Sequence, residues 1–442
     1  MPSLGVSTTA MPGIHEPVST RELQMATAAQ ESHAPDQDHI RGLDGLRGVA
    51  VMMVMALHVC KANNHTPSHV VNFIYGVIHS GWVGVDLFFV LSGFLITRIL
   101  FRTQHDSHYL RNFYARRFLR IFPLYYGAIA VLVLLEPVLH LHLWRALPYY
   151  LSYTANLRAT GPIRFPDVPG NAWVISHFWS LQIEEQFYLV WPFALAILRT
   201  RRNIVLGAFI GSIGALAMRC YFVADAARYT NEYWAYAFTP CRIDALLIGS
   251  ALAILWSTRA RAMLIRTAPT MFAAFATILV GFGLWRREFD PTDNRFVLTI
   301  GFTVVALAAV ALIILVMSRK TVGQIFEHRV LCWLGKYSYG IYVLHFIWNY
   351  FLSEPLRRGV VTATNSKALG VAIPALTIMG ISILSAYASF ELFEKRMLRL
   401  KHHFEYEDTQ RGLSSTAADN DAGLSPAALD SAAALQVVWP AQ

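Results

Sequence analysis

Ten apolar runs of about 16–24 residues recur along this chain, and they constrain its fold more than any other feature. They begin near residues 45, 81, 122, 178, 204, 238, 268, 296, 331 and 370. A helix of about 20 apolar residues matches the hydrocarbon core of a bilayer. Only 15% of the residues are charged and 55% are hydrophobic, whereas soluble domains carry about 25% charged residues. The sequence therefore predicts an all-α fold, a polytopic membrane helix bundle of about ten transmembrane helices.

Basic residues predict how this bundle is oriented. Arg or Lys is in excess in the loops after spans two, four, six and eight, and again after the last span. These segments share one side with the N-terminus only if the short segment 144–156 does not cross. The positive-inside rule therefore favours both termini in the cytoplasm of a cell (inner) membrane, with 144–156 as an interfacial or re-entrant piece. The same clustering accounts for the net charge of +9 without nucleic acid as a partner.

The two ends of the chain differ from its middle. Residues 1–40 are rich in Ser, Thr, Ala and Pro, and no basic region precedes an apolar stretch there. We therefore expect a disordered cytoplasmic tail and no cleavable signal peptide. Residues 400–442 become rich in Ala, Ser and Asp, which predicts a second, mostly disordered cytoplasmic tail. Residues 41–399 remain as the membrane domain.

The four cysteines form no CxxC pair and no Cys/His cluster at zinc spacing, so we expect no metal site. All four lie in or beside apolar segments, which favours small buried side chains. A disulfide between Cys60 and either Cys220 or Cys241 stays open as an alternative.

Arg47 and His58 lie on one predicted membrane helix. They are eleven positions apart, close to three turns, so they share a face with Val51 and Val54 and lie about 16 Å apart. An ionisable group within a membrane helix is costly unless it faces protein or water. The pattern indicates chemistry at two depths, because an imidazole can remove a hydroxyl proton near neutral pH. The structural alternative is a histidine hydrogen-bonded between helices.

A cluster of arginines precedes span three. In RNFYARRFLRIFPLYY, Arg117 and Arg120 are three residues apart and share a helix face. Guanidinium groups match phosphate oxygens, which indicates a phosphate-binding patch at the cytoplasmic surface. The alternative is a cluster that anchors the helix to lipid headgroups.

Further polar side chains fall at the middle to outer depth of the predicted spans, namely Asp86, Glu184, Glu185, Arg242, Asp244 and His345. A carboxylate near His58 can orient its ring, and we expect Asp86 or Glu184 in that role. For both acids the alternative is a helix-pairing role. Adjacent residues point about 100° apart on a helix, so we expect only one of Glu184 and Glu185 to face a given cavity.

Six motifs in order resemble the acyltransferase-3 family of integral-membrane O-acyltransferases, over residues 41–399. They are GLDGLRGVAVMMVMALH, GWVGVDLFFVLSGFLITR, FYARRFLRIFPLYY, FWSLQIEEQFYLVWP, TPCRIDALLIG and LGKYSYGIYVLHF. The resemblance implies ten spans, an acyl-CoA donor at the cytoplasmic side and an extracytoplasmic acceptor. It also implies that Arg47 and His58 form the central motif and that Arg117 and Arg120 lie at the donor end. Glu184 matches the family glutamate better than Glu185, because it follows Trp179 by five residues.

We therefore predict a membrane O-acyltransferase that moves an acyl group, by resemblance acetyl, from acyl-CoA to a hydroxyl of a glycan or glycolipid. The expected catalytic residues are His58, Glu184 and Asp86, the donor-binding residues Arg47, Arg117 and Arg120, and the substrate-binding residues Arg242 and His345. Acyl-CoA is a substrate, and no bound cofactor is expected. Some relatives append an SGNH-type domain, so this membrane unit is expected to act alone or with a separate periplasmic partner.

Three alternatives stay open from the residues. A covalent acyl-histidine intermediate competes with direct transfer. A transporter would also use intramembrane acids and histidines as a proton relay, although internal repeats typical of transporters are not apparent. A non-catalytic scaffold would not need an arginine and a histidine three turns apart on one face.

Overall fold

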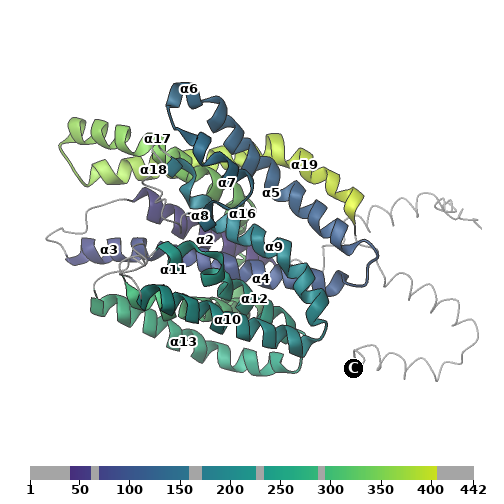
Figure 1. Ribbon diagram of the computed structural model, residues 1–442. Helices are drawn as coiled ribbons and strands as arrows, with labels where there is room; N and C mark the ends of the chain where they lie inside the picture. Colours follow the sequence, from purple (N-terminus) through teal and green to yellow (C-terminus); the bar gives the residue numbers. More distant parts are fainter. Residues whose placement is uncertain (1–39, 61–68, 159–171, 225–232, 287–293, 406–442) are drawn as a thin grey trace, which may run out of the picture. The chain divides into compact units, whose positions relative to one another are not determined.

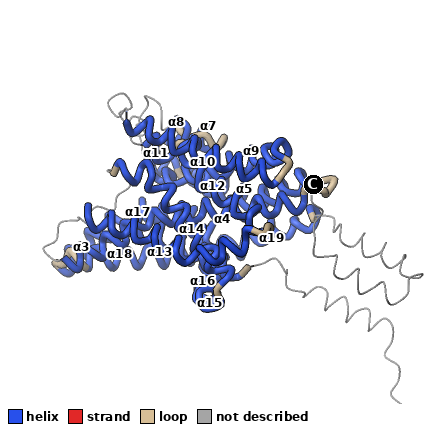
Figure 2. The backbone as a smooth tube through the Cα atoms, turned by 90° about the horizontal axis from the view of Figure 1, so that it is seen from below, coloured by secondary structure: helices blue, strands red, loops and turns tan. Residues whose placement is uncertain are grey.

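The computed structural model describes residues 40–60, 69–158, 172–224, 233–286 and 294–405. Throughout these ranges the regular structure is helical, with no strand (Figures 1 and 2), which confirms the predicted all-α fold. The long helices are α2 (Arg41–Val59), α3 (His69–His79), α4 (Val83–Thr103), α5 (Tyr109–Leu134), α9 (Trp179–Leu198), α10 (Arg201–Ala224), α12 (Thr239–Trp256), α13 (Ala260–Arg286), α14 (Phe302–Ser318), α17 (Ser338–Thr364) and α18 (Leu369–Ser389).

Short helices connect the long ones. The α-helices among them are α6 (Glu136–Leu139), α7 (Leu147–Leu151), α8 (Ala155–Arg158), α11 (Tyr233–Ala237), α15 (Lys320–Phe326), α16 (Arg329–Lys336) and α19 (Lys395–Arg399). The 3-10 turns are η1 (Ser80–Trp82), η2 (Leu143–Arg145), η4 (Ala172–Phe178) and η7 (Leu400–Phe404). Two π-helical turns, η5 (Val297–Gly301) and η6 (Phe390–Glu394), lie next to α14 and α18.

Within the described ranges, eight helical stretches are long and apolar enough to cross a membrane. They are Arg41–Val59, Phe73–Thr103, Tyr109–Leu134, Arg201–Ala224, Trp234–Trp256, Ala260–Gly281, Val297–Ser318 and Leu369–Phe404. The other two predicted spans form the helices α9 and α17, which are long enough but more polar. They carry glutamates, glutamines and arginines that lower their mean hydropathy. The protein is thus a polytopic membrane bundle.

The segment 144–156 does not form a spanning helix. It is divided among η2, α7 and α8, of which the longest has five residues. Side chains of longer helices hold it in place: Tyr125 Oη donates to the carbonyl of Tyr150 at 2.8 Å, and the amide N–H of Asn156 donates to Gln182 Oε1 at 2.7 Å. These bonds satisfy backbone groups that a lipid environment would leave unpaired.

Helices α4 and α12 pack closely because two glycines meet the opposite backbone. A Cβ atom added at Gly93 would lie 1.9 Å from the carbonyl oxygen of Leu246, and one at Gly249 would lie 2.1 Å from that of Val90. Neither position tolerates a side chain, as is typical of closely packed membrane helices. In Figure 1, α10 and α13 lie below α12, and the helices α17 and α18, which pack against each other, lie above α2.

The C-terminal helical segment extends beyond the predicted domain end at 399. The turn η7 continues to Phe404 and packs along α5, where Arg116 Nη1 donates to the carbonyl of Phe404 at 3.1 Å and Asn112 Nδ2 to that of Glu405 at 2.8 Å. The remainder of both predicted tails, 1–39 and 406–442, lies outside the described residues. All four cysteines are free thiols, so neither alternative disulfide of Cys60 is formed.

Candidate functional site

A cavity lies between α2, α4, α5, α9 and α17. It gathers guanidinium, carboxylate and hydroxyl groups from helices far apart in the sequence. Its lining residues include Arg47, Phe88, Phe89, Ser92, Arg117, Arg120, Ser180, Glu184, Glu185, Tyr188, Tyr339 and Tyr342. Four of the predicted site residues, namely Arg47, Arg117, Arg120 and Glu184, therefore meet in one cavity.

Three arginines, namely Arg47, Arg117 and Arg120, line one part of this cavity. Arg117 lies over two aromatic rings, with its Cζ 5.2 Å from the Tyr188 centroid and 5.9 Å from that of Phe113. Arg47 Nη1 bonds to Asp44 Oδ1 at 3.1 Å, one helical turn away. Arg120 is exposed. Each of these guanidinium groups can donate two parallel hydrogen bonds to phosphate oxygens, so together they suit a phosphate ligand.

Both neighbouring glutamates of α9 line the cavity, although their angular separation on the helix predicted that only one would do so. The cavity contacts α9 over more than two turns, from Ser180 to Tyr188, and it is therefore wide enough to include both. Ser92 Oγ of α4 donates to Glu184 Oε1 at 2.7 Å. Glu184 also interacts electrostatically with Arg117 and Arg47, so it belongs to the arginine end of the site.

His58 contacts His345, which lies 287 residues later in the chain: its Nδ1 is 2.9 Å from His345 Nε2. His345 is fully buried in α17, whereas His58 is half-buried in α2. Phe346 lies edge-on to the His58 ring, at 4.9 Å between centroids. Neither histidine lines the cavity, but Tyr342 does, and its ring is 5.6 Å from that of His345. The histidine pair thus borders the cavity through Tyr342.

A third histidine, His177, was not among the predicted site residues. It lies just before α9, and its ring centroid is 5.2 Å from that of His345. His177 Nε2 donates to the carbonyl of Val343 at 3.2 Å. Its place beside the FWSLQIEEQ motif is the sequence signal that could have identified it. Among the residues that the structure describes, no group of three or more His, Cys, Asp or Glu is placed to hold a metal ion.

Asp86 lies against Arg242 rather than against His58. Arg242 Nη2 donates to Asp86 Oδ1 at 2.8 Å, and both side chains are at most 2% exposed. The Arg242 guanidinium also sits 3.5 Å from the Phe302 centroid and within 6 Å of the Phe89, Trp179 and Tyr236 rings. Neither Asp86 nor Arg242 lines the cavity. The pair connects α4 to α12 behind the cavity wall.

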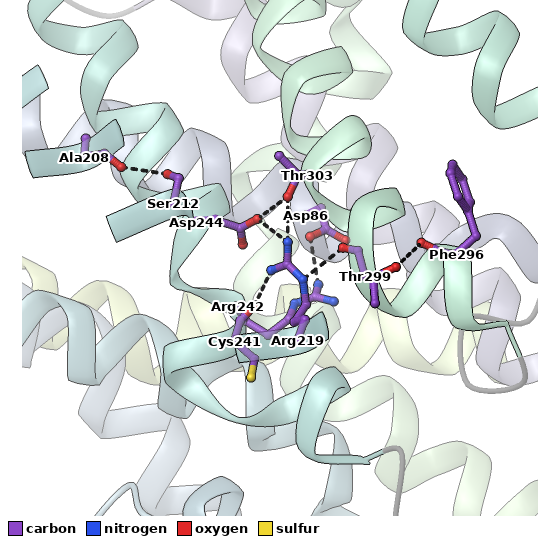
Figure 3. A network of polar contacts seen from close by, with 10 residues as sticks. All are labelled: Asp86, Ala208, Ser212, Arg219, Cys241, Arg242, Asp244, Phe296, Thr299 and Thr303. Carbon is purple, nitrogen blue, oxygen red and sulfur yellow. Dashed lines mark hydrogen bonds and ion pairs between the residues drawn. The ribbon is translucent and has the colours of Figure 1, made fainter. Parts of the chain in front are cut away.

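A second buried ion pair lies beside the first (Figure 3). Arg219 Nη2 of α10 donates to Asp244 Oδ2 at 2.8 Å and to Thr303 Oγ1 at 2.6 Å, and the Thr303 hydroxyl donates to the same Asp244 oxygen. Arg219 Nε donates to the carbonyl of Thr299 in the π-helical turn η5 at 3.0 Å. Arg219 was not among the predicted site residues, because a lone arginine in an apolar helix carries no spacing signal.

Comparison with known proteins places these features in a family. Residues 40–389 match the Acyl_transf_3 family, described as an acyltransferase domain. The chain is 32% identical to "Peptidoglycan O-acetyltransferase OatA" of Listeria monocytogenes, over 70% of this chain and 49% of that protein. It is 30% identical to "Putative peptidoglycan O-acetyltransferase YrhL" of Bacillus subtilis, over 70% and 48%.

The similarity extends to "Putative O-acetyltransferase SACOL0978" of Staphylococcus aureus, at 28% identity over 70% of this chain and 50% of that protein. The chain thus spans about half the length of these curated relatives. No solved structure matches it. Since the family match covers most of the chain and the whole described bundle up to Ser389, the chain belongs to the acyltransferase-3 family of membrane proteins.

Proposed function

We propose that this protein is an acyl-CoA-dependent O-acyltransferase that modifies a hydroxyl of an extracytoplasmic glycan. The observation that carries the proposal is the cavity lined by three arginines, one of which is Arg47 of α2. His58 lies three turns further along α2. A phosphate-binding end and a proton-accepting end, about 16 Å apart, suit a donor with a charged head and a long neutral arm. The names of the relatives favour acetyl as the group and peptidoglycan as the acceptor.

In the proposed reaction, Arg117 and Arg120 bind the phosphates of the donor, with Arg47 at the inner edge of the same cluster. The acyl thioester then reaches the end of the cavity beside Tyr342. His58 removes the proton of the acceptor hydroxyl as the oxygen attacks the thioester carbon. The carbon–sulfur bond breaks, and the thiolate of CoA takes up the proton from the imidazolium.

The remaining predicted site residues support this cavity. Glu184, held by Ser92 at 2.7 Å, interacts electrostatically with Arg117 and Arg47, and we assign it to positioning the donor-binding arginines. Asp86 and Arg242 hold α4 against α12 and so keep Phe89 and Trp179 in place. The positive-inside rule puts the arginine end, and with it both termini, on the cytoplasmic side.

The test is CoA release from acetyl-CoA by the full-length protein in nanodiscs, with peptidoglycan fragments as acceptor. We expect acceptor-stimulated release that is lost in His58→Ala and strongly reduced in Arg120→Ala. Arg111→Ala is the matched control, because it removes the same charge from an exposed position of the same helix that does not line the cavity. Full activity of His58→Ala, or an absence of saturable acyl-CoA binding, would overturn the proposal.

A further inference from the structure

The bonds of His345 determine which of its ring nitrogens carries the proton. His345 Nδ1 lies 2.7 Å from the carbonyl oxygen of Tyr342 and 3.1 Å from that of Ile341. A carbonyl oxygen can only accept a hydrogen bond, so Nδ1 must be the N–H of His345. In the neutral imidazole the other nitrogen, Nε2, then holds the lone pair.

The tautomer of His345 determines that of His58. Its Nδ1 lies 2.9 Å from His345 Nε2, and an acceptor at Nε2 requires a donor facing it. His58 therefore carries its proton on Nδ1, which leaves the lone pair on its own Nε2. The backbone carbonyls of α17 thus define the tautomer of a residue on α2 through one intervening ring.

Neighbouring rings hold this arrangement in place. Phe346 contacts His58 edge-on, with an interplanar angle of 89°, and stacks on His177 at 28°. His345 packs between His58 and His177, with centroids 5.1 Å and 5.2 Å away. His345 is fully buried, so its ring cannot turn without displacing these neighbours.

We propose that His345 is a positioning residue that holds His58 in the Nδ1–H tautomer, so that His58 Nε2 is the atom that accepts the acceptor's proton. This inference rests on the proposed function and adds to it the partner of the base, a role that sequence analysis assigned to a carboxylate. His345 does not change its own protonation in the step. The proton passes from the acceptor hydroxyl to His58 Nε2 and then to the CoA thiolate, while the Nδ1–H to His345 bond persists.

The test compares two substitutions of His345 in the full-length protein in nanodiscs. Gln places an amide oxygen near the former position of Nε2 and can accept from His58 Nδ1, whereas Leu cannot. We expect His345→Leu to lower kcat about 100-fold, at the low end of what general base catalysis contributes, with KM for acetyl-CoA changed less than twofold. His345→Gln should recover at least tenfold of that loss.

His177→Gln and His177→Leu serve as the matched control, since His177 is a buried histidine of the same cluster whose Nε2 bonds to a backbone carbonyl. Gln and Leu should differ there by less than threefold. Equal kcat for His345→Gln and His345→Leu would overturn the inference, whether both are impaired or both are active. An active His58→Ala would instead reject the proposed function itself, so the two failures are distinguishable.

Discussion

The sequence suggested a catalytic role for Asp86 and a substrate-binding role for Arg242, whereas the structure pairs the two side chains with each other. Replacing both tests whether this ion pair is structural. The perturbation is a cycle of Asp86→Leu, Arg242→Met and the double variant. Both side chains are at most 2% exposed, so either single change leaves a charge buried without its counter-charge. Such a loss costs about 3–5 kcal/mol, whereas apolar replacement of both partners is often neutral.

The two single variants should differ, because Arg242 has a second source of stabilisation. Its guanidinium lies 3.5 Å from the Phe302 centroid and near three further rings. A desolvated cation–π contact contributes about 2 kcal/mol. We therefore expect Asp86→Leu to lower the free energy of unfolding by about 1–3 kcal/mol and Arg242→Met by about 3–5 kcal/mol. The double variant leaves no unpaired charge but also loses the cation–π contact, so it should come within about 2 kcal/mol of the wild type.

The assay is unfolding of the purified protein in mixed micelles of increasing SDS content, followed by tryptophan fluorescence. CoA release per folded molecule is measured on the same samples. If the pair is structural, activity follows the folded fraction and the double variant is active. A double variant that is folded but releases no CoA would refute the reasoning and return Asp86 or Arg242 to the chemistry.

Three further outcomes are expected. Lys401 interacts electrostatically with Arg120, Arg117 and Arg116, so Lys401→Ala removes a positive charge near the predicted phosphate site. It should raise KM for acetyl-CoA about threefold with kcat unchanged, measured by CoA release at low ionic strength. No change in KM would place Lys401 outside the donor site. Gly93→Ala forces a Cβ to 1.9 Å from the Leu246 carbonyl oxygen and should abolish the monodisperse peak in detergent chromatography, whereas Gly214→Ala meets no atom within 4 Å and should elute normally. Ser92→Ala removes the 2.7 Å bond to Glu184 and should lower affinity for acetyl-CoA about threefold to tenfold, roughly the 0.5–1.5 kcal/mol of one hydrogen bond; unchanged titration calorimetry would contradict that role.

Much of the architecture was predictable from the sequence, because the bilayer demands apolar helices of one length. All ten predicted spans correspond to helices in the described residues, and eight meet the length and hydropathy required for crossing. The exceptions, α9 and α17, are informative. Their polar residues include Glu184 and His345, and a helix that supplies groups to a buried site cannot be uniformly apolar.

The arginine end of the site was also predictable. Helical spacing places Arg117 and Arg120 on one face of α5, and charge puts them at the same side of the membrane as Arg47. The structure brings all three into one cavity with Glu184. Glu185 was not expected there, since spacing describes the direction of a side chain but not the width of the space it faces.

The partners of the buried polar groups were decided by tertiary structure alone. The sequence predicted that Asp86, His58 and His345 lie at similar depth, because position along a membrane helix follows from residue count. It did not determine how each helix is rotated about its axis or which helices are neighbours. Helix rotation and helix neighbours depend on close contacts such as Gly93 against Leu246. In the folded bundle, Asp86 therefore pairs with Arg242, and His58 contacts His345, 287 residues away.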